Sequence, residues 1–341
     1  MLILRPIERA DLDDLIVLAE MLDSMNLPSD RGFLEQRINQ SVRTFENRPG
    51  DEDRGISVFV LEDLETGRII GSSLILHKIG TPGSPYFWLE VSEEERRSVE
   101  LDRRFVHRML RLRSTEDGPT EIGGLILDPA YRRHPERCGK ALSIVRLVWM
   151  GLHPERFERE VIAEMMSPFE ESGENLLWEA FGAKFTGLSY READHLSARD
   201  KRFITDLFPR EAVYTTLFPH NVQEAIGQTG RAAKAAVRIL ERVGFRYLNQ
   251  VDPFDGGPYY GASRDAISSV RDRRELVLPS TVRRLDASYE GPLALLSSEG
   301  ERGFRATVVP LDEESAPIVT DECRRALGVK GGDRVNVTPL P

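Results

Sequence analysis

Glu121-Ile-Gly-Gly-Leu-Ile-Leu127 is the stretch that decides the fold, and it is followed by Asp128-Pro129 and by Gly139-Lys-Ala-Leu-Ser-Ile-Val-Arg-Leu-Val-Trp-Met150. The first run predicts a buried strand, and Pro129 disfavours helix at the residue before it. The last run repeats apolar side chains at helical spacing. The turn between them carries four cations, Arg132, Arg133, Arg137 and Lys140. Because the first N–H groups of a helix are unpaired and its dipole favours negative charge, this turn predicts a phosphate-binding site.

The composition limits the classes of protein to which the chain can belong. Its 341 residues predict about two domains, and its 40% apolar content is enough to build real cores. A net charge of −10 argues against binding to nucleic acid or to anionic membranes. The two cysteines, Cys138 and Cys323, lie far apart and have no metal-ligand spacing around them. This spacing gives no reason to expect a metal. No apolar run is long enough to cross a bilayer, so we expect a cytoplasmic protein.

The residues around the central stretch predict alternating strands and helices. Strands are expected at 2–7, 56–62, 68–76, 86–90 and 160–166, and a hairpin turn is expected at Glu65-Thr-Gly67. Helices are expected at 9–22, with Asp11 as a cap, and at 31–46. A polar loop is expected at 47–54. The charged segment that continues to Arg113 is also expected to be helical, and a helix at 175–182 is expected to end on Gly182 before a strand at 183–190.

The second half of the chain contains a partial echo of the first half. A helix at 232–245 ends in Gly244-Phe245, as the helix at 175–182 ends in Phe181-Gly182, and a strand at 246–251 follows it. One echo predicts at most a partial second copy, and a chance helix terminus accounts for it nearly as well. After Arg274, short apolar runs alternate with Gly/Pro turns, which predicts a small β-barrel. We therefore expect three segments, 1–200, 201–274 and 275–341.

The basic turn, Glu136-Arg-Cys-Gly-Lys-Ala141, resembles the pyrophosphate loop of the GCN5-related acyltransferases, usually written Q/R-x-x-G-x-G/A. Glu136 stands where this pattern has Gln or Arg, and Arg137 lies beside it. The order of expected elements over residues 1–200 is similar to that of an acyl-CoA N-acyltransferase domain. The resemblance implies an α/β fold in which helices flank a mixed central sheet.

Longer blocks resemble the arginine N-succinyltransferase family over nearly the whole chain. They include Val161-Ile-Ala-Glu-Met165, Leu177-Trp-Glu-Ala-Phe-Gly182, Asp252-Pro-Phe-Asp-Gly-Gly-Pro258 and Ala326-Leu-Gly-Val-Lys-Gly-Gly-Asp-Arg-Val335. The resemblance implies direct transfer of a succinyl group from succinyl-CoA to the α-amine of arginine or ornithine, without a covalent intermediate. It also implies a homodimer, or a hetero-oligomer with a paralogous subunit.

The chain departs from this family at one functional position. The family's acid/base is assigned to a histidine two residues after its Ile-Gly-Gln block, and here that position is Gly230. Six histidines remain in the chain, none of them in this motif, and His220 is the nearest in sequence. His220 is therefore the candidate catalytic substitute, although a loop histidine is more often part of a polar surface. The departure leaves open a different amine acceptor, or a non-catalytic subunit that pairs with an active paralogue.

The resemblance and the residue chemistry together predict a set of site residues. Those expected to bind acyl-CoA are Leu125, Ile126, Leu127, Arg137, Cys138, Gly139, Lys140 and Ala141. Without the resemblance, Leu125 is an ordinary core residue and the turn is a solvated basic loop. Glu164 lies in an apolar strand. If its carboxylate is buried there, its pKa is raised, which would suit a general base or a residue that binds a cationic substrate. The alternative is that Glu164 lies on the solvent-exposed face of the strand. Asp255 and Gly256 are expected to bind the substrate guanidinium, or else to form an Asp-Gly turn.

Overall fold

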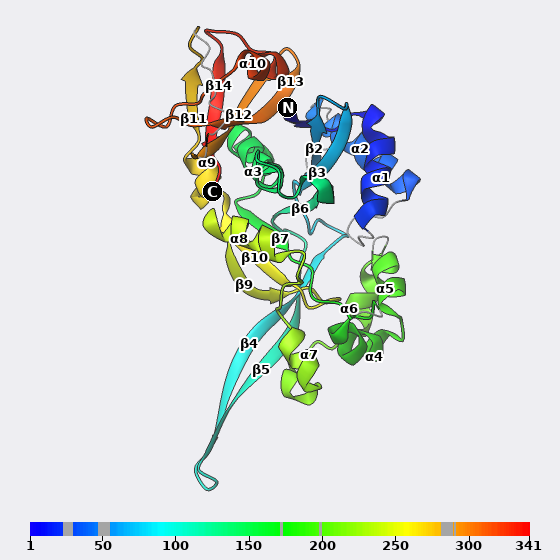
Figure 1. The fold of residues 1–341 in the computed structure, drawn as a ribbon. Helices are drawn as coiled ribbons and strands as arrows, with labels where there is room; N and C mark the ends of the chain where they lie inside the picture. The colour runs from blue at the N-terminus through cyan, green and yellow to red at the C-terminus, as the bar shows by residue number, and fades with distance from the viewer. Residues whose placement is uncertain (23–29, 47–54, 171–172, 198–199, 281–288, 290) are drawn as a thin grey trace.

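The computed structural model describes residues 1–22, 30–46, 55–170, 173–197, 200–280, 289 and 291–341. The predicted loop at 47–54 lies outside these residues. Within them the strands form a 14-stranded mixed sheet, in the order β11-β14-β12-β13-β1-β2-β3-β6-β7-β10-β9-β4-β5-β8 (Figure 1). Helices pack on the central part of this sheet, which confirms the predicted α/β fold with its mixed sheet flanked by helices.

The central part of the sheet contains the strands that the sequence predicts best. These are β1 (Leu2–Pro6), β2 (Ile56–Asp63), β3 (Arg68–Leu76), β6 (Thr120–Leu127), β7 (Glu160–Glu164) and β10 (Pro258–Ser263). On one face, α1 (Leu12–Leu22) and α2 (Arg31–Phe45) bury a cluster that includes Leu18, Ile38 and Val60. On the other face, α3 (Cys138–Leu152) and α8 (Lys234–Arg242) bury the largest cluster, which includes Leu142 and Val145.

A long two-stranded arm projects from the sheet, at the opposite end of the molecule from β11–β14 (Figure 1). It consists of β4 (Tyr86–Ser98) and β5 (Arg103–Thr115). β9 (Arg246–Val251) pairs with β4 near the base of the arm, and β8 (Val213–Tyr214) pairs with β5 about halfway along it. The predicted helix before Arg113 is therefore wrong. Glu and Arg favour helix locally, but here they form ion pairs between the two strands, as in Arg104–Glu95 at 2.6 Å and Arg113–Glu90 at 2.8 Å.

The segment after Trp178 is helical where the sequence predicts a strand. A π-helical turn (Trp178–Gly182) runs directly into α4 (Ala183–Thr186), so the helix does not end on Gly182. Gly182 has helical dihedrals, and a Cβ there would lie 2.3 Å from the Trp178 ring, so glycine is needed for packing. Gly187, at φ 68°, ends the helix instead. The helices α5 (Tyr190–Ser197), α6 (Arg202–Leu207) and α7 (His220–Ala225) follow.

The C-terminal strands extend the sheet and do not close into the predicted barrel. They are β11 (Arg274–Val277), β12 (Leu293–Gly300), β13 (Gly303–Pro310) and β14 (Arg334–Pro339), with α10 (Asp321–Leu327) between the last two. β13 pairs with β1 through Leu4↔Ala306, and β11 ends the order at the other side. The barrel stays open because β13 uses its second edge to bind β1. The division into three segments stays a prediction.

Short elements complete the described chain. They are α9 (Ser268–Arg271) and the 3-10 turns η1 (Arg9–Asp11), η2 (Pro129–Tyr131), η3 (Pro154–Arg156), η5 (Thr215–Leu217) and η6 (Arg264–Ala266). Asp11 accepts a hydrogen bond from the backbone N–H of Glu8 at 2.7 Å, in a capping box at the start of the first helix. Among the residues described, no helix combines the length and the apolar character that crossing a membrane requires.

Arg5 on β1 ties the start of the chain to the sheet through buried ionic contacts. Its guanidinium donates two hydrogen bonds of 2.8 Å to the Asp11 carboxylate and a third, of 2.6 Å, to Glu62 on β2. Breaking a buried ion pair typically costs about 3–5 kcal/mol, and Glu62 alone compensates the Arg5 charge only in part when Asp11 is removed. These contacts therefore hold the first helix against the strand that joins the central and C-terminal parts of the sheet.

We expect Asp11→Asn to lower the free energy of unfolding by about 3 kcal/mol, because it removes the main counter-charge of Arg5. Urea unfolding followed by circular dichroism measures this loss. The matched control is Asp13→Asn, because Asp13 pairs with Arg31 at 3.0 Å on the surface, where both side chains are exposed. Equal losses in the two variants would contradict the importance given to the buried contacts.

Candidate functional site

β6 and β7 are parallel neighbours that separate along their length. They pair only through Thr120↔Val161 and Glu121↔Ile162, among the residues that the structure describes. From there to the ends of the two strands no further pairing joins them. Backbone groups of the second half of β6 are therefore available on the β7 side, as expected for a strand that presents N–H groups to a ligand.

A bulge in β6 lies where the two strands separate. Ser72 of β3 pairs with Ile126 and Leu74 pairs with Gly123, so β6 has one extra residue between these pairs. Gly124, at φ 57°, takes up the bend in a region that favours glycine. The extra residue reverses the side-chain alternation. Ile122 packs on the α3 side and Ile126 on the α1–α2 side, whereas Leu125 and Leu127 pack toward α3.

The basic turn ends at α3, close to β6. Arg137 precedes the helix in a left-handed conformation (φ 52°), and its carbonyl accepts hydrogen bonds from the N–H groups of Lys140 at 2.8 Å and Ala141 at 3.1 Å. A Cβ at Gly139 would meet only Leu127, at 3.8 Å, so there is room beside this residue. The Lys140 ammonium donates to the backbone carbonyl of Pro341. The structure thus places the predicted binding residues of the turn and of β6 near one another.

Cys138 and Ala141 are the residues of the turn whose side chains belong to the buried core cluster under α3. The side chain of Cys138 is buried, and burial raises the pKa of its thiol to about 12. Such a thiol stays protonated at neutral pH and is a poor nucleophile. Cys138 therefore packs under the turn and does not face a ligand.

An acidic cluster lies at the end of β7, on the sheet face opposite α3. Tyr259 of β10 pairs with Glu164, and its hydroxyl lies 3.2 Å from Glu164 Oε2 and 3.3 Å from Asp252 Oδ2. Carboxylate oxygens of Glu164, Asp252 and Asp255 all lie within 4.8 Å of one another. Glu164 is accessible to solvent, whereas Asp252 and Tyr259 are buried. This concentration of negative charge can attract a cation.

Desolvation, followed by repulsion between neighbouring carboxylates, raises the pKa values of Glu164, Glu121 and Asp255. Partial desolvation, followed by the charges of Asp252 and Glu121, raises the pKa of Glu164 well above its ordinary value. Desolvation raises the pKa of Glu121 to about 7, although Lys201 and Arg37 oppose this shift. The raised pKa of Glu164 is the shift predicted for a carboxylate in an apolar strand, whereas its exposure is what the alternative of a solvent-facing glutamate predicts, so its role stays a prediction.

Asp255 and Gly256 form a tight turn beside this cluster. Asp255 accepts backbone hydrogen bonds from Gly257 at 2.6 Å and from Ser167 at 2.9 Å, and Gly256 has φ 76°. Desolvation and the charge of Asp252 raise the pKa of Asp255 to about 7. Because both carboxylate oxygens already accept backbone hydrogen bonds, Asp255 shapes the turn, and its predicted contact with substrate stays a prediction.

The structure pairs His220 with Glu224 on the surface of α7 and places Gly230 beside the segment that follows β7. His220, on α7, is exposed, and its ring lies 3.4 Å from Glu224 one helical turn later. The N–H of Gly230 donates to the carbonyl of Met166 at 2.8 Å, just beyond β7. A Cβ at Gly230 would lie 2.8 Å from the carbonyl oxygen of Ser167. Backbone atoms therefore occupy the space that the Cβ of a histidine at position 230 would need.

Three residues of the cluster were not predicted from the sequence, namely Glu121, Asp252 and Tyr259. Glu121 stands at the polar end of an apolar strand, as Glu164 does, and this shared pattern is the signal that could have identified it. Asp252 and Tyr259 flank the Phe254-Asp-Gly-Gly-Pro258 block. Nothing in their local sequence indicates that β10 lies beside β7.

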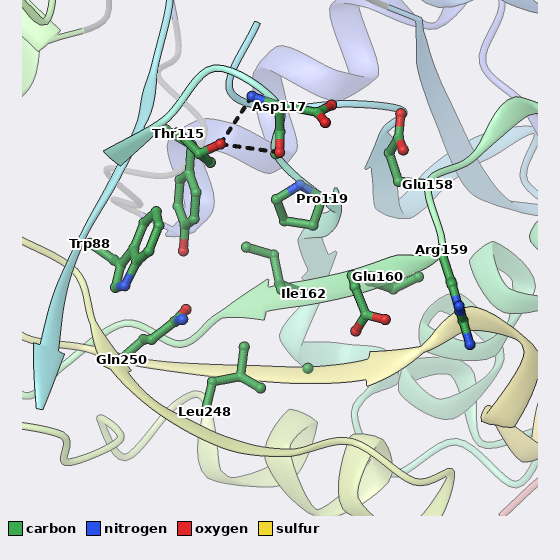
Figure 2. A pocket seen from close by; sticks show the side chains of 14 residues that line it. Trp88, Thr115, Asp117, Pro119, Glu158, Arg159, Glu160, Ile162, Leu248 and Gln250 are labelled. Atoms are coloured by element: carbon green, nitrogen blue, oxygen red, sulfur yellow. Dashed lines mark hydrogen bonds between the residues drawn. The ribbon is translucent and has the colours of Figure 1, made fainter. Parts of the chain in front are cut away.

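A separate pocket of about 400 Å³ lies between the base of the arm and the start of β7. Figure 2 shows Trp88 and Gln250 on one side of it, and Glu158 and Arg159 on the other. Tyr86, which also lines this pocket, stacks on Trp88 with ring centroids 5.2 Å apart. The Tyr86 ring also meets Tyr259 edge to face at 5.5 Å, so the two tyrosines stand between the pocket and the acidic cluster.

Comparisons with known proteins identify the family of the chain. A family model described as arginine N-succinyltransferase beta subunit matches residues 2–269. Arginine N-succinyltransferases from Citrobacter koseri and Escherichia coli are 31% and 30% identical, over 100% of this chain and 98% of theirs. The arginine/ornithine succinyltransferase subunit AI of Pseudomonas aeruginosa superposes with a TM-score of 0.84 at 28% identity, over 100% of this chain and 99% of that one. The chain therefore belongs to the arginine N-succinyltransferase family.

Proposed function

We propose that this protein transfers a succinyl group from succinyl-CoA to the α-amine of arginine or ornithine, by direct attack of the amine on the thioester. The observation that carries the proposal is the gap between β6 and β7, which has a helix N-terminus near one end and an acidic cluster at the other. A thioester in this gap lies between a site for its anionic cofactor and a site for a cationic amine.

The N-terminus of α3 is the proposed seat of the CoA pyrophosphate. The side chain of Arg137 is exposed, and Gly139 leaves space for close approach to the backbone. Charge-assisted hydrogen bonds to phosphate oxygens are among the strong ones in proteins. From there the pantetheine arm follows β6 along Leu125, Ile126 and Leu127, whose backbone on the β7 side has no strand partner among the residues described.

The acidic cluster is the proposed acceptor site. Arginine and ornithine each carry a positive charge on the side chain, which Glu164, Asp252 and Glu121 attract. The α-amine must lose a proton to attack the thioester carbon. Glu164 is the proposed base because it is exposed at the end of the gap and has a raised pKa. His220 stays a weaker candidate because its side chain pairs with Glu224 on the surface.

The proposed reaction needs no covalent enzyme intermediate. The amine nitrogen bonds to the carbonyl carbon while its proton passes to Glu164, and the thioester oxygen takes up negative charge. When the C–S bond breaks, the CoA thiolate leaves and takes a proton in turn. The buried Cys138 thiol, with its pKa raised to about 12, is not a competing nucleophile.

The direct test of the proposed function is thiol release from succinyl-CoA in the presence of single amines. We expect arginine or ornithine to release CoA, and Nα-acetylarginine to release none because its α-amine is blocked. Acetyl-CoA serves as the second donor, and the ratio of its rate to the rate with succinyl-CoA measures the preference for the acyl group. Binding of succinyl-CoA without turnover of any amine would contradict the proposal and favour a non-catalytic subunit.

We expect Glu164→Gln to lower kcat by about 10²–10⁴-fold, as loss of a general base does. In the wild type, kcat should fall as pH decreases through the raised pKa of Glu164, because only the carboxylate accepts the proton. Asp252→Asn removes a neighbouring negative charge, so this acidic limb should move to lower pH, by roughly one unit. Steady-state pH profiles measure both effects. The exposed Glu155→Gln is the control, and an unchanged limb in Asp252→Asn would refute the assignment.

We expect Arg137→Ala to weaken binding of succinyl-CoA by about 10-fold or more, because a hydrogen bond to a charged group contributes roughly 1.5–3 kcal/mol. Isothermal calorimetry measures the loss, and Arg137→Lys should recover part of it. Arg132→Ala is the comparison, since Arg132 is an exposed cation on the approach to the turn. Its smaller effect should disappear at high salt. Equal, salt-sensitive effects in both variants would place the pyrophosphate elsewhere.

A further inference from the structure

Arg146 is a buried cation behind the bulge of β6. It lies in the third turn of α3 and is 3% exposed. Its guanidinium donates to the carbonyl of Gly123 at 3.0 Å, and to the carbonyl and hydroxyl oxygens of Ser143 at 3.1 Å each. Within the described part of the chain, no carboxylate forms an ion pair with it. Burial alone lowers its pKa, to about 9, and no neighbouring charge offsets this effect.

A buried charge without a counter-ion is costly for a fold. Its removal from water costs several kcal/mol, and a hydrophobic residue of similar volume often replaces such a group without loss of stability. The neighbours of Arg146 on α3, Val145 and Leu147, are completely buried apolar residues. The packing of α3 on the sheet therefore does not by itself require a guanidinium at this position.

The hydrogen bond to Gly123 shows what the guanidinium does to β6. Arg146 approaches the sheet from α3, so the Gly123 carbonyl that it binds is directed toward the helix. In a trans peptide the N–H of Gly124 is coplanar with the C=O of Gly123 and opposite to it, so a contact that fixes this carbonyl also fixes the N–H. Gly124, at φ 57°, permits the bend that this orientation needs.

We propose that Arg146 is a positioning residue for acyl transfer, which holds the Gly123–Gly124 peptide at the bulge and places a buried positive charge behind the thioester. The inference rests on the proposed function, because it requires the thioester to lie in the gap between β6 and β7. As the amine attacks, the carbonyl oxygen becomes negative, and an oriented peptide N–H and a nearby cation in a dry environment stabilise that charge. Arg146 exchanges no atom or proton with the substrate.

The test compares Arg146→Met, Arg146→Lys and Ile144→Ala. Ile144 is a completely buried apolar residue of the same helix, so its truncation is a control for lost packing. We expect Arg146→Met to lower kcat by roughly 100-fold while the KM for succinyl-CoA changes less than threefold, as for the loss of an oxyanion donor. Arg146→Lys should recover about 10-fold of the lost kcat, because it restores the positive charge but not the planar guanidinium with its several donors. Ile144→Ala should lower the melting temperature at least as much and leave kcat within threefold.

A second measurement does not depend on the acceptor. Infrared difference spectra of bound succinyl-CoA, labelled with ¹³C at the thioester carbonyl, report how strongly the protein polarises that bond. We expect a shift to lower frequency in the wild type and a smaller shift in Arg146→Met. Equal kcat losses in Arg146→Met and Ile144→Ala, at equal melting temperatures, would overturn the inference. Identical infrared bands of bound succinyl-CoA in the wild type and in Arg146→Met would also overturn it. If the wild type binds succinyl-CoA but acylates no amine, only the proposed function fails, whereas absence of binding overturns both.

Discussion

β6 and β7 begin side by side and then separate, and the other parts of the site are arranged around this gap. Two parallel pairs join the strands, and the bulge at Gly124 turns the rest of β6 away from regular pairing. Sheets normally satisfy every backbone group inside them, so a gap within a sheet leaves groups that a ligand can use. The bulge also reverses the side-chain alternation, which directs Leu125 toward α3 while Glu121, before the bulge, faces the opposite side.

The site separates charges that suit two different substrates. The whole chain has a net charge of −10, yet its basic turn gathers four cations at the start of α3. The acidic residues gather instead around the end of β7, on the other face of the sheet. In the proposed function, an anionic cofactor and a cationic amine are drawn to opposite sides of one gap. This arrangement places reactive groups close together while it keeps the opposite protein charges from neutralising one another.

The loop around Gly230 explains how the site accommodates the missing histidine. Its backbone donates to Met166 and approaches Ser167 closely, directly after the strand that carries Glu164. A histidine could enter only if this backbone moved, because its Cβ would lie 2.8 Å from a carbonyl oxygen. The close approach instead helps to fix the segment after β7. At position 230 the family resemblance implies an acid/base side chain. In this chain the backbone of Gly230 packs there instead and supports the segment that follows β7.

The sequence by itself determined the strand, turn and helix at 121–150, the hairpin of β2 and β3, and the family, because these depend on local periodicity and short-range chemistry. It failed for β4–β5, where Glu and Arg favour helix until a second strand pairs with them, and for 183–190, where Gly182 continues the helix. Only the tertiary structure brought Tyr259 to Glu164, 95 residues away. It did so because strand order, which local sequence does not encode, places β10 beside β7. The buried hydrogen bond from Arg146 to Gly123 has the same origin, since a helix and a strand must first pack together before it can form.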